Sequence, residues 1–403
     1  MPTPADIRNA YERIQSGIVR TPCVPALAFG DVIPCPLHLK LENLQRTGSF
    51  KDRGALNRLL DLTAQQRKQG VVTASAGNHA QAVAYHCGRL GIPASVVMPE
   101  ATPLIKISNT RRYGARISQH GATLSDAMSE AQRMVLEEGL TLVHPFDDER
   151  VIEGQGTIAL ELSEQLPDLT LLVAPIGGGG LIGGIAATLK QLGRNVRVVG
   201  VEADAAPSAH ASRAAGHVVH IETTETIADG IAVKRVGEKT FPLLEQYVDD
   251  IVTVGEDEIA AAIHLLIERQ KLVAEGAGAV ALAAALARKF RIAPDDVAVL
   301  IVSGGNIDVN IIQRIIERGL VREGRLAHLV VKMRDRPGSL ARLTRMIAEA
   351  GANVLETVHR RAFADISVGE VEIVMHVETR GQDHVADIMA LMRDNGLRVE
   401  EEI

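Results

Sequence analysis

A long apolar run enters four consecutive glycines at residues 169–180 (LTLLVAPIGGGG), and the helical pattern LIGGIAATLKQLG follows directly. An apolar run without polar alternation is typical of a strand that is covered on both faces. Such strands occur in parallel sheets, where each crossover helix packs back onto the sheet. This segment therefore predicts an α/β fold with a buried parallel sheet.

The same strand-to-helix unit recurs along the first 320 residues. Strands are expected in GVVTASAG (70–77), ASVVMP (94–99), GARISQHG (114–121), VRVVGVEA (196–203) and DVAVLIVSGGN (296–306), and helices in 78–91, 102–114 and 123–139. Strands that alternate with helices imply parallel sheets with crossover helices. We expect two open parallel-sheet lobes in residues 1–320, with a small lobe of about 46–145 inserted in the large one.

The pattern changes after a short charged linker at about 321–326. Strands are expected at 327–333, 352–363, 369–380 and 397–403, and amphipathic helices at 334–351 and 382–396, with the two middle strands half-buried. This order is βαββαβ, a ferredoxin-like α+β sandwich. Residues 327–403 are therefore expected to form a separate, small regulatory domain.

Composition excludes several classes of protein. The formal net charge of −7 argues against a surface that binds polyanions. Cys23, Cys35 and Cys87 show no metal-binding or redox spacing, and such sparse cysteines fit a reducing compartment. No uncharged apolar stretch reaches the roughly 18 residues that a membrane span needs. We expect a cytoplasmic protein with neither a nucleic-acid nor a membrane partner.

Gly177–Gly180 are the first candidate site. Without Cβ atoms, their backbone amides can close around an anion, and the start of the following helix adds a favourable dipole. The pattern is neither G-x-G-x-x-G nor a Walker loop, because no Gly-Lys-Ser/Thr follows. We interpret the loop as a phosphate cradle; the alternative is a tight turn.

Three further loops carry polar groups next to expected strands. ASAGNHAQ (74–81) offers Ser75, Gly77 and Asn78 at a helix start, which suits a carboxylate, although a plain Asn cap is the alternative. VSGGNID (302–308) ends a strand with Ser303, and SFKDRG (49–54) presents Lys51; their alternatives are a polar turn and an exposed lysine. Ligands collect beyond the carboxyl ends of parallel strands. Together the loops supply what a phosphorylated aldehyde cofactor and an amino acid need.

The motifs SFKDRGA, SAGNHAQ, GGGGL and SGGN occur here in the order found in the fold-type II (tryptophan synthase beta-like) pyridoxal-phosphate enzymes. Over essentially its whole length the chain resembles the threonine dehydratase (threonine ammonia-lyase) family with a C-terminal ACT domain. The resemblance implies pyridoxal 5'-phosphate as cofactor. It also implies dehydration and deamination of L-threonine, and less well of L-serine, to the 2-oxo acid and ammonia, as in isoleucine biosynthesis.

The resemblance also implies roles for individual residues. Lys51 resembles the Schiff-base lysine, with Phe50 packing against the cofactor ring, Asn78 bonded to the ring 3-hydroxyl and Ser303 at the ring nitrogen. Ser75, Ala76, Gly77, Asn78 and His79 match the loop that holds the substrate carboxylate, and Gly177, Gly178, Gly179, Gly180 and Leu181 match the phosphate loop.

Two features depart from related serine racemases. Ala76 stands where those enzymes carry a second serine, the acid–base on the opposite face, which argues for a dehydratase. VEADAAPSAH resembles their metal loop through Glu202, Ala206 and Ser208, but Ser208 replaces an aspartate, so a monovalent cation is an alternative to a divalent one. Glu275 lies in a comparable loop without an assigned role.

DRPGSLARL resembles the first turn and helix of ACT domains, which bind small effectors between paired domains. Gly338, Ser339, Leu340 and Asn353 are the expected effector-binding residues, with isoleucine or valine as inhibitor and a homodimer or homotetramer as assembly. The alternative is an inert or purely dimerising module.

Rival functions remain open at this point. The same site could prefer serine or 3-hydroxyaspartate, and a β-replacing synthase would use the same machinery. A non-catalytic amino-acid sensor is the alternative of a different class, and the intact Lys51, Asn78 and Ser303 argue against it.

Overall fold

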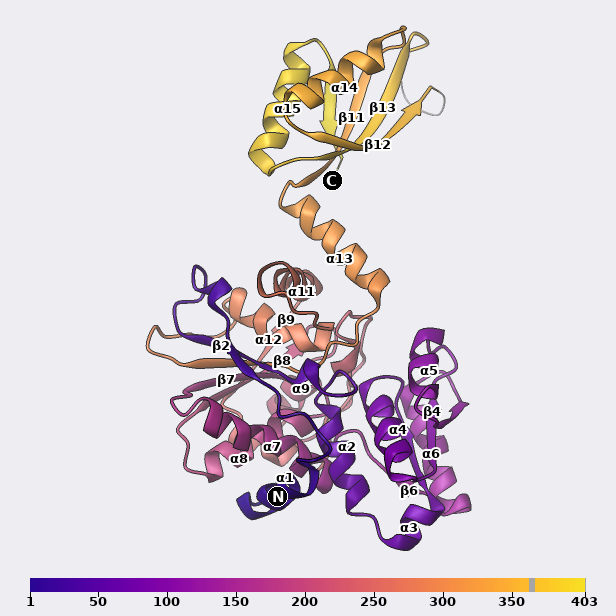
Figure 1. Ribbon diagram of the computed structural model, residues 1–403, viewed down its shortest axis with the longest axis vertical. Helices are drawn as coiled ribbons and strands as arrows, with labels where there is room; N and C mark the ends of the chain where they lie inside the picture. The colour runs from indigo at the N-terminus through magenta and orange to yellow at the C-terminus, as the bar shows by residue number, and fades with distance from the viewer. Residues whose placement is uncertain (362–366, 403) are drawn as a thin grey trace. The chain divides into compact units, whose positions relative to one another are not determined.

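The apolar run before the glycines forms β7 (Leu171–Pro175), an entirely buried strand of a six-stranded sheet (Figure 1). This is seen in a computed structural model that describes residues 1–361 and 367–402. The sheet order is β1 (Cys23–Pro25), β2 (Leu37–Leu41), β10 (Ala298–Val302), β7, β8 (Arg197–Ala203) and β9 (Asp250–Val254). Only the β1–β2 pair is antiparallel among these strands, so the predicted parallel sheet is confirmed.

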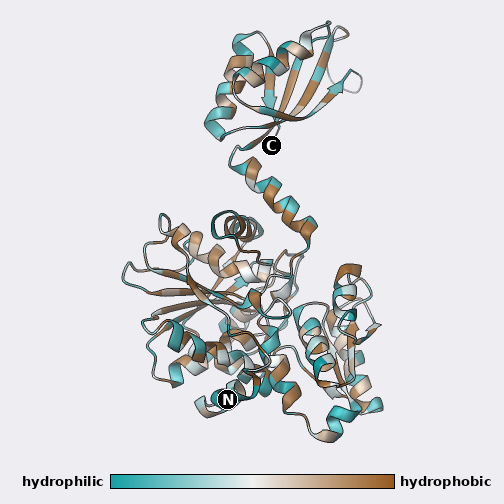
Figure 2. Cartoon of the chain, viewed as in Figure 1, coloured by the Kyte–Doolittle hydropathy of each residue, from teal (hydrophilic) through white to brown (hydrophobic). Residues whose placement is uncertain are grey.

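Helices cover both faces of this sheet. α11 (Glu256–Gln270) and α12 (Gly276–Leu286) lie on one side, and α7 (Glu149–Gln165) and α8 (Gly180–Gln191) lie on the other (Figure 1). The remaining elements are α1 (Pro4–Ile14), α9 (Ser208–Ala215), α10 (Phe241–Tyr247) and the 3₁₀ turns η1 (Leu27–Phe29), η2 (Glu42–Leu44) and η3 (Asp229–Ile231). The brown strands of Figure 2 show how apolar this interior is.

A second, wholly parallel sheet lies between β2 and β7 in chain order. Its strand order is β5 (Arg116–Gln119), β4 (Ala94–Met98), β3 (Val71–Ala74) and β6 (Thr141–Leu142). Val71 packs towards α2 (Lys51–Leu60) and α4 (Asn78–Leu90), whereas Val72 packs towards α6 (Leu124–Glu138). α3 (Ala64–Gln69) and α5 (Leu104–Arg111) complete this lobe. Two parallel-sheet lobes are therefore present, as predicted.

The C-terminal unit holds an antiparallel sheet. Its elements follow the order α13 (Val309–Arg322), β11 (Leu326–Arg334), α14 (Ser339–Glu349), β12 (Asn353–Arg360), β13 (Glu370–Glu378), α15 (Gln382–Asp394) and β14 (Arg398–Glu401). The sheet order is β12-β13-β11-β14, and one face packs on α14 and α15. The predicted βαββαβ sandwich is thus confirmed.

Details of the C-terminal unit differ from expectation. β12 is exposed along nearly its whole length rather than half-buried, because it is the edge strand of the sheet. Residues 362–363 of that expected strand, and Ile403, lie outside the described residues. α13 extends to Arg322 and so overlaps the linker expected at 321–326, while the contacts divide the chain after Ile307. No helix in the described residues is long and apolar enough to cross a membrane.

A buried ion network anchors α2 beneath the first sheet. The Arg53 guanidinium, which is 0% exposed, donates through Nη2 to Glu42 Oε1 at 2.7 Å and through Nη1 to Glu161 Oε1 at 2.8 Å. Lys40 also pairs with Glu161 and donates to the Thr21 carbonyl at 2.7 Å. Two buried acids therefore face two buried bases, which ties α2 to β2, η2 and α7.

Replacement of Arg53 by alanine should leave two buried carboxylates without the guanidinium that pairs with them. We expect Arg53→Ala to lower the free energy of unfolding by about 3–5 kcal/mol, measured by urea denaturation followed by circular dichroism. Arg133→Ala is the matched control, because Arg133 pairs with Glu130 and Glu137 on an exposed helix face and should leave the midpoint unchanged. Equal effects of the two substitutions would contradict this account of the network.

Candidate active site

Lys51 is the first residue of α2, and the loop before it is tied to that helix. The Asp52 carboxylate accepts the Thr47 backbone N–H at 2.9 Å and the Thr47 hydroxyl at 2.7 Å. His86 Nε2 lies 3.2 Å from the same carboxylate. Because Asp52 follows Lys51 directly, these contacts fix the start of the lysine side chain.

The Lys51 loop is also bonded to the loop that follows β10. The Phe50 N–H donates to the Ser303 carbonyl at 3.0 Å, and the Gly305 N–H donates to the Gly48 carbonyl at 2.9 Å. Gly48 has φ +80°, and a Cβ there would lie 2.6 Å from Asn306 Oδ1. These bonds bring SFKDRG and SGGN, far apart in sequence, side by side at the end of one strand.

The Lys51 side chain is half-buried, and its amine is bound to a backbone carbonyl. Its Nζ donates to the Pro145 carbonyl at 2.7 Å and lies 5.0 Å from the centroid of the Phe50 ring. Burial lowers the pKa of Lys51 to about 8, because the charged ammonium loses its hydration, while the charge of Glu275 acts in the opposite direction. A substantial fraction of this amine is therefore neutral near pH 8.

The glycine loop after β7 presents free backbone donors. Within the described residues, no acceptor takes the N–H groups of residues 177–181. A Cβ at Gly178 would lie 2.1 Å from Phe146 Cγ, and Gly179 has φ +89° with Thr240 Oγ1 2.8 Å from its Cβ position. Only glycines fit so close to these neighbours, and the free N–H groups at the start of α8 suit an anion.

The loop between β3 and α4 holds Ser75, Ala76 and Gly77. The Ser75 hydroxyl accepts the Gly77 N–H at 3.3 Å. A neighbour on α4, His79, has Nε2 3.0 Å from the Val143 carbonyl, and its Nδ1 is buried without a partner in the described part of the chain. Burial, with a smaller contribution from the Lys51 charge, lowers the pKa of His79 to about 3, so this imidazole is neutral.

The orientation of the Asn78 amide follows from a chain of hydrogen bonds. Asn306 Nδ2 donates to the Thr47 carbonyl at 2.7 Å, which identifies this atom as the amide nitrogen because a carbonyl only accepts. The same nitrogen donates to Asn78 Oδ1 at 2.7 Å, so Asn78 Nδ2 faces Glu275 Oε1 at 2.6 Å. One hydrogen of Asn78 Nδ2 is left to donate to a ligand.

Glu275 is a buried acid next to this chain. Burial and the nearby Asp229 charge raise the pKa of Glu275 to about 7, while the bond from Asn78 acts in the opposite direction. Ser303, two residues before Gly305, donates its hydroxyl proton to the Ala277 carbonyl at 3.2 Å. Its hydroxyl would have to turn from that carbonyl to bond a ring nitrogen.

In the loop expected to bind a cation, the oxygen atoms instead accept hydrogen bonds from the backbone of the same segment. Both oxygens of Glu202 accept N–H groups at the start of α9, from Ala209 at 2.7 Å and His210 at 2.8 Å. The Ala206 carbonyl accepts the Ser208 N–H at 3.0 Å. Burial raises the pKa of Glu202 to about 7 despite these donors. In this structure Glu202 caps a helix, and a cation there stays a prediction.

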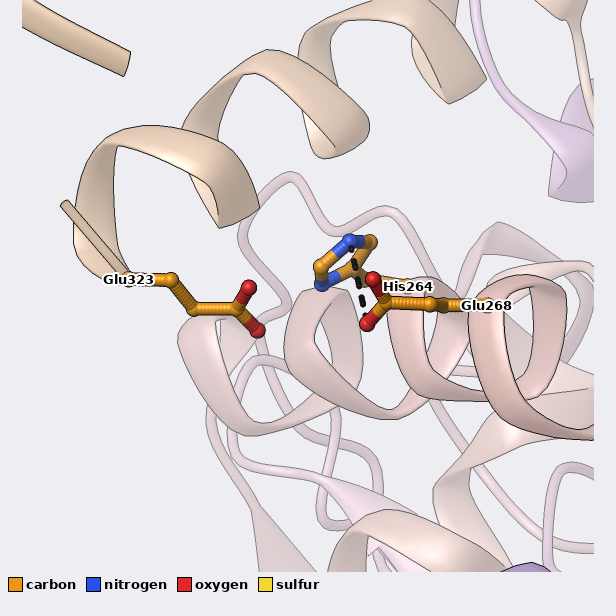
Figure 3. A group of neighbouring side chains, drawn as sticks. All are labelled: His264, Glu268 and Glu323. Carbon is orange, nitrogen blue, oxygen red and sulfur yellow. Dashed lines mark ion pairs between the residues drawn. The ribbon is translucent and has the colours of Figure 1, made fainter. Parts of the chain in front are cut away.

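Elsewhere in this unit, His264 and Glu268 lie one turn apart on α11, with Nε2 and Oε2 4.0 Å apart (Figure 3). Glu323, also labelled there, belongs to the C-terminal unit.

The expected effector residues all lie in the C-terminal unit. Gly338 precedes α14 with φ +87°, and Ser339 and Leu340 begin that helix. Asn353 begins β12, and its Nδ2 lies 3.3 Å from Glu378 Oε2.

Sequence reasoning missed Pro145, Phe146 and Asn306. Pro145 and Phe146 stand in the HPFDDE segment after β6, which gave no recognisable motif of its own. Asn306 stood in the SGGN motif, but its contact with Asn78 joins residues 228 apart in sequence. A polar loop at a strand end was the available signal, and it did not specify the partners.

The pKa of Lys51 can be tested in the protein freed of any bound aldehyde. Because burial favours the neutral amine, acetylation of Lys51 by a trace of acetic anhydride should reach half of its maximal rate near pH 8. Peptide mapping by mass spectrometry measures it, with exposed Lys68 as an internal reference for reagent. If the modification rate of Lys51 rises only above about pH 9.5, the lowered pKa would be contradicted.

Comparison with known proteins agrees with this geometry. Residues 14–304 match the family model of pyridoxal-phosphate dependent enzymes, and residues 327–395 match the ACT domain. The chain is 45% identical to the L-threonine ammonia-lyases of Geobacter sulfurreducens (98% of both chains) and Thermotoga maritima (99% of both). The structure of serine racemase from Dictyostelium discoideum superposes with a TM-score of 0.71 at 38% identity, covering 76% of this chain and 99% of that one. The chain therefore belongs to the pyridoxal-phosphate dependent enzyme family and carries a C-terminal ACT domain.

Proposed function

We propose that this protein is a threonine ammonia-lyase, which converts L-threonine, and less well L-serine, to 2-oxobutanoate or pyruvate and ammonia. The observation that carries the proposal is the half-buried Lys51 side chain, whose loop is bonded through Phe50 and Ser303 to the end of β10, next to the strand that leads into the glycine loop. The two L-threonine ammonia-lyases support it, because they match the chain along both units.

The residues present fit pyridoxal 5'-phosphate. The unpartnered N–H groups of residues 177–181 would hold the phosphate, and the Lys51 amine would bind the aldehyde. Phe50, Asn78 and Ser303 would contact the ring, its hydroxyl and its nitrogen. When bound, the cofactor stabilises negative charge that develops at the substrate Cα.

The protein supplies binding and proton transfer. The Ser75–Gly77 loop and the start of α4 offer N–H dipoles to the substrate carboxylate, and neutral His79 adds no positive charge there. Once its amine is free, Lys51 takes the proton from the substrate Cα, and a pKa of about 8 suits a general base near neutral pH. The Pro145 carbonyl orients the amine for this step.

Ala76 argues that this protein is not a racemase. A racemase needs a second acid–base on the opposite face of the substrate, and the Ala76 methyl group cannot donate or accept a proton. The two L-threonine ammonia-lyases match 98–99% of this chain, including the ACT domain, and support the same assignment. Loss of the β-hydroxyl is therefore the favoured outcome.

The test is release of 2-oxo acid by the purified holoenzyme. We expect L-threonine to give a higher kcat/KM than L-serine and 3-hydroxyaspartate, and we expect no D-serine from L-serine. Lys51→Ala should lower the rate by at least about 10³-fold, since it removes the general base. Lys68→Ala is the control and should keep full activity.

A faster reaction with 3-hydroxyaspartate would leave the proposed chemistry intact but would contradict L-threonine as the preferred substrate. Unchanged activity of Lys51→Ala would overturn the catalytic role of the lysine. If none of the three amino acids gives a 2-oxo acid, a synthase or a sensor would be favoured.

We further propose that isoleucine or valine binds the ACT domain at Gly338, Ser339, Leu340 and Asn353 and inhibits a homodimer or homotetramer. The Leu340 N–H at the start of α14, which has no acceptor in the described residues, and the absence of a Cβ at Gly338 support this placement. The three free cysteines agree with a reducing compartment, and the cytoplasm remains our proposal.

The effector proposal predicts a selective loss of regulation. Gly338→Ala forces a left-handed conformation on alanine, which should displace the loop and weaken inhibition by isoleucine and valine at least tenfold while basal kcat is unchanged. Gly396→Ala is the matched control, because Gly396 has φ +78° and open surroundings in the same unit. Equal inhibition of both variants, measured by effector titration of threonine turnover, would contradict the assignment.

A further inference from the structure

The ACT sheet carries a row of four titratable side chains on its helix-free face. Glu356 on β12, His376 on β13 and His328 on β11 are successive partners across the strands. Glu402, just after β14, extends the row, because its N–H donates to the His328 carbonyl at 2.9 Å. The alternate residues of β11 and β13, such as Leu329 and Met375, point into the core below α14 and α15.

The two histidines lie directly opposite each other. Their ring centroids are 4.7 Å apart, with an interplanar angle of 67°. His328 Nδ1 lies 3.4 Å from Glu402 Oε2, and His376 Nδ1 lies 3.3 Å from Glu356 Oε2. Each imidazole therefore has one carboxylate on its outer side and the other imidazole on its inner side.

Each Nδ1 lies within ion-pair distance of a carboxylate. Because a carboxylate is an acceptor, it favours a proton on that Nδ1 and leaves Nε2 of the neutral ring with its lone pair. Carboxylate–imidazole pairs of this kind commonly stand behind metal-binding histidines, where they fix the tautomer and raise basicity. Among the described residues, the polar contacts of His328 and His376 are made through Nδ1, and Nε2 of either ring has no hydrogen-bond partner.

The strand pairing holds the two rings in place. β11 and β13 pair without interruption from Leu326–Glu378 to Arg334–Glu370, and directly opposite residues have Cβ atoms about 5 Å apart. The side chains of His328 and His376 are 30% and 45% exposed, so an ion can reach them from solvent. The flanking acids make the row favourable for a cation.

We propose that His328 and His376 together bind a divalent transition-metal ion, such as Zn²⁺, through their Nε2 atoms. Glu402 and Glu356 orient the rings from behind, and water completes the coordination. Imidazole ligands select Zn²⁺, Cu²⁺ or Ni²⁺ over Mg²⁺ and Ca²⁺, which prefer oxygen. This site is separate from the proposed active site and does not depend on the substrate assignment.

The test is calorimetric titration of the full-length holoenzyme with ZnCl₂ in a buffer without chelating groups. His328→Gln and His376→Gln should each weaken binding of one equivalent by at least tenfold. His359→Gln is the matched control, because it removes an exposed histidine that pairs with Ile373 outside the row. Far-UV circular dichroism checks that each variant is folded.

Two further readouts make the proposal specific. The electron paramagnetic resonance spectrum of one added equivalent of Cu²⁺ should show hyperfine coupling to two nitrogens, and either histidine substitution should reduce it to one. Glu356→Gln should weaken Zn²⁺ binding by about tenfold, as expected for loss of an orienting carboxylate. Binding that is equal in all variants, or absent from the unmodified chain, would overturn the proposal.

Discussion

The bonds between the Arg53 guanidinium and two buried carboxylates are the interaction on which the active-site region depends. Glu42 follows β2 and Glu161 stands on α7, so one side chain joins α2 to two elements of the large lobe. Burial of these charges would be unfavourable unless each were paired. Arg53 lies two residues after Lys51, so the network that fixes α2 also fixes the first turn that carries the amine.

The position of the amine then follows from strand ends that meet at one edge. Parallel strands place their following loops together, which brings the Lys51 loop, the loop after β10 and the glycine loop into one region. The same enclosure lowers the pKa of Lys51 and leaves the loop N–H groups without acceptors. The lowered pKa of the Lys51 amine and the affinity of the glycine loop for an anion thus have one origin, which is the removal of polar groups from water.

Much of this arrangement could be predicted from local patterns. The uninterrupted apolar run before the glycines indicated a buried parallel strand, and period-two alternation in residues 327–333 indicated the strand that became β11. The four loop motifs indicated a common site because strand ends gather ligands. These inferences need only the immediate neighbours of a residue in sequence.

Features that depend on distant pairing could not be predicted in this way. The Arg53–Glu161 and Asn306–Asn78 contacts join segments 108 and 228 residues apart, and no local pattern specifies such partners. The position of β12 at a sheet edge determines its exposure, which its own composition does not reveal. The His328–His376 pair likewise requires the register of β11 and β13.

The most direct test of the central claim, that Lys51 is aimed at a bound aldehyde, is borohydride reduction of the holoenzyme followed by peptide mapping. The account predicts that pyridoxal phosphate becomes fixed to a single lysine, Lys51, in the peptide that contains SFKDRG. Label on another lysine, such as Lys40 or Lys106, or no covalent label at all, would contradict it.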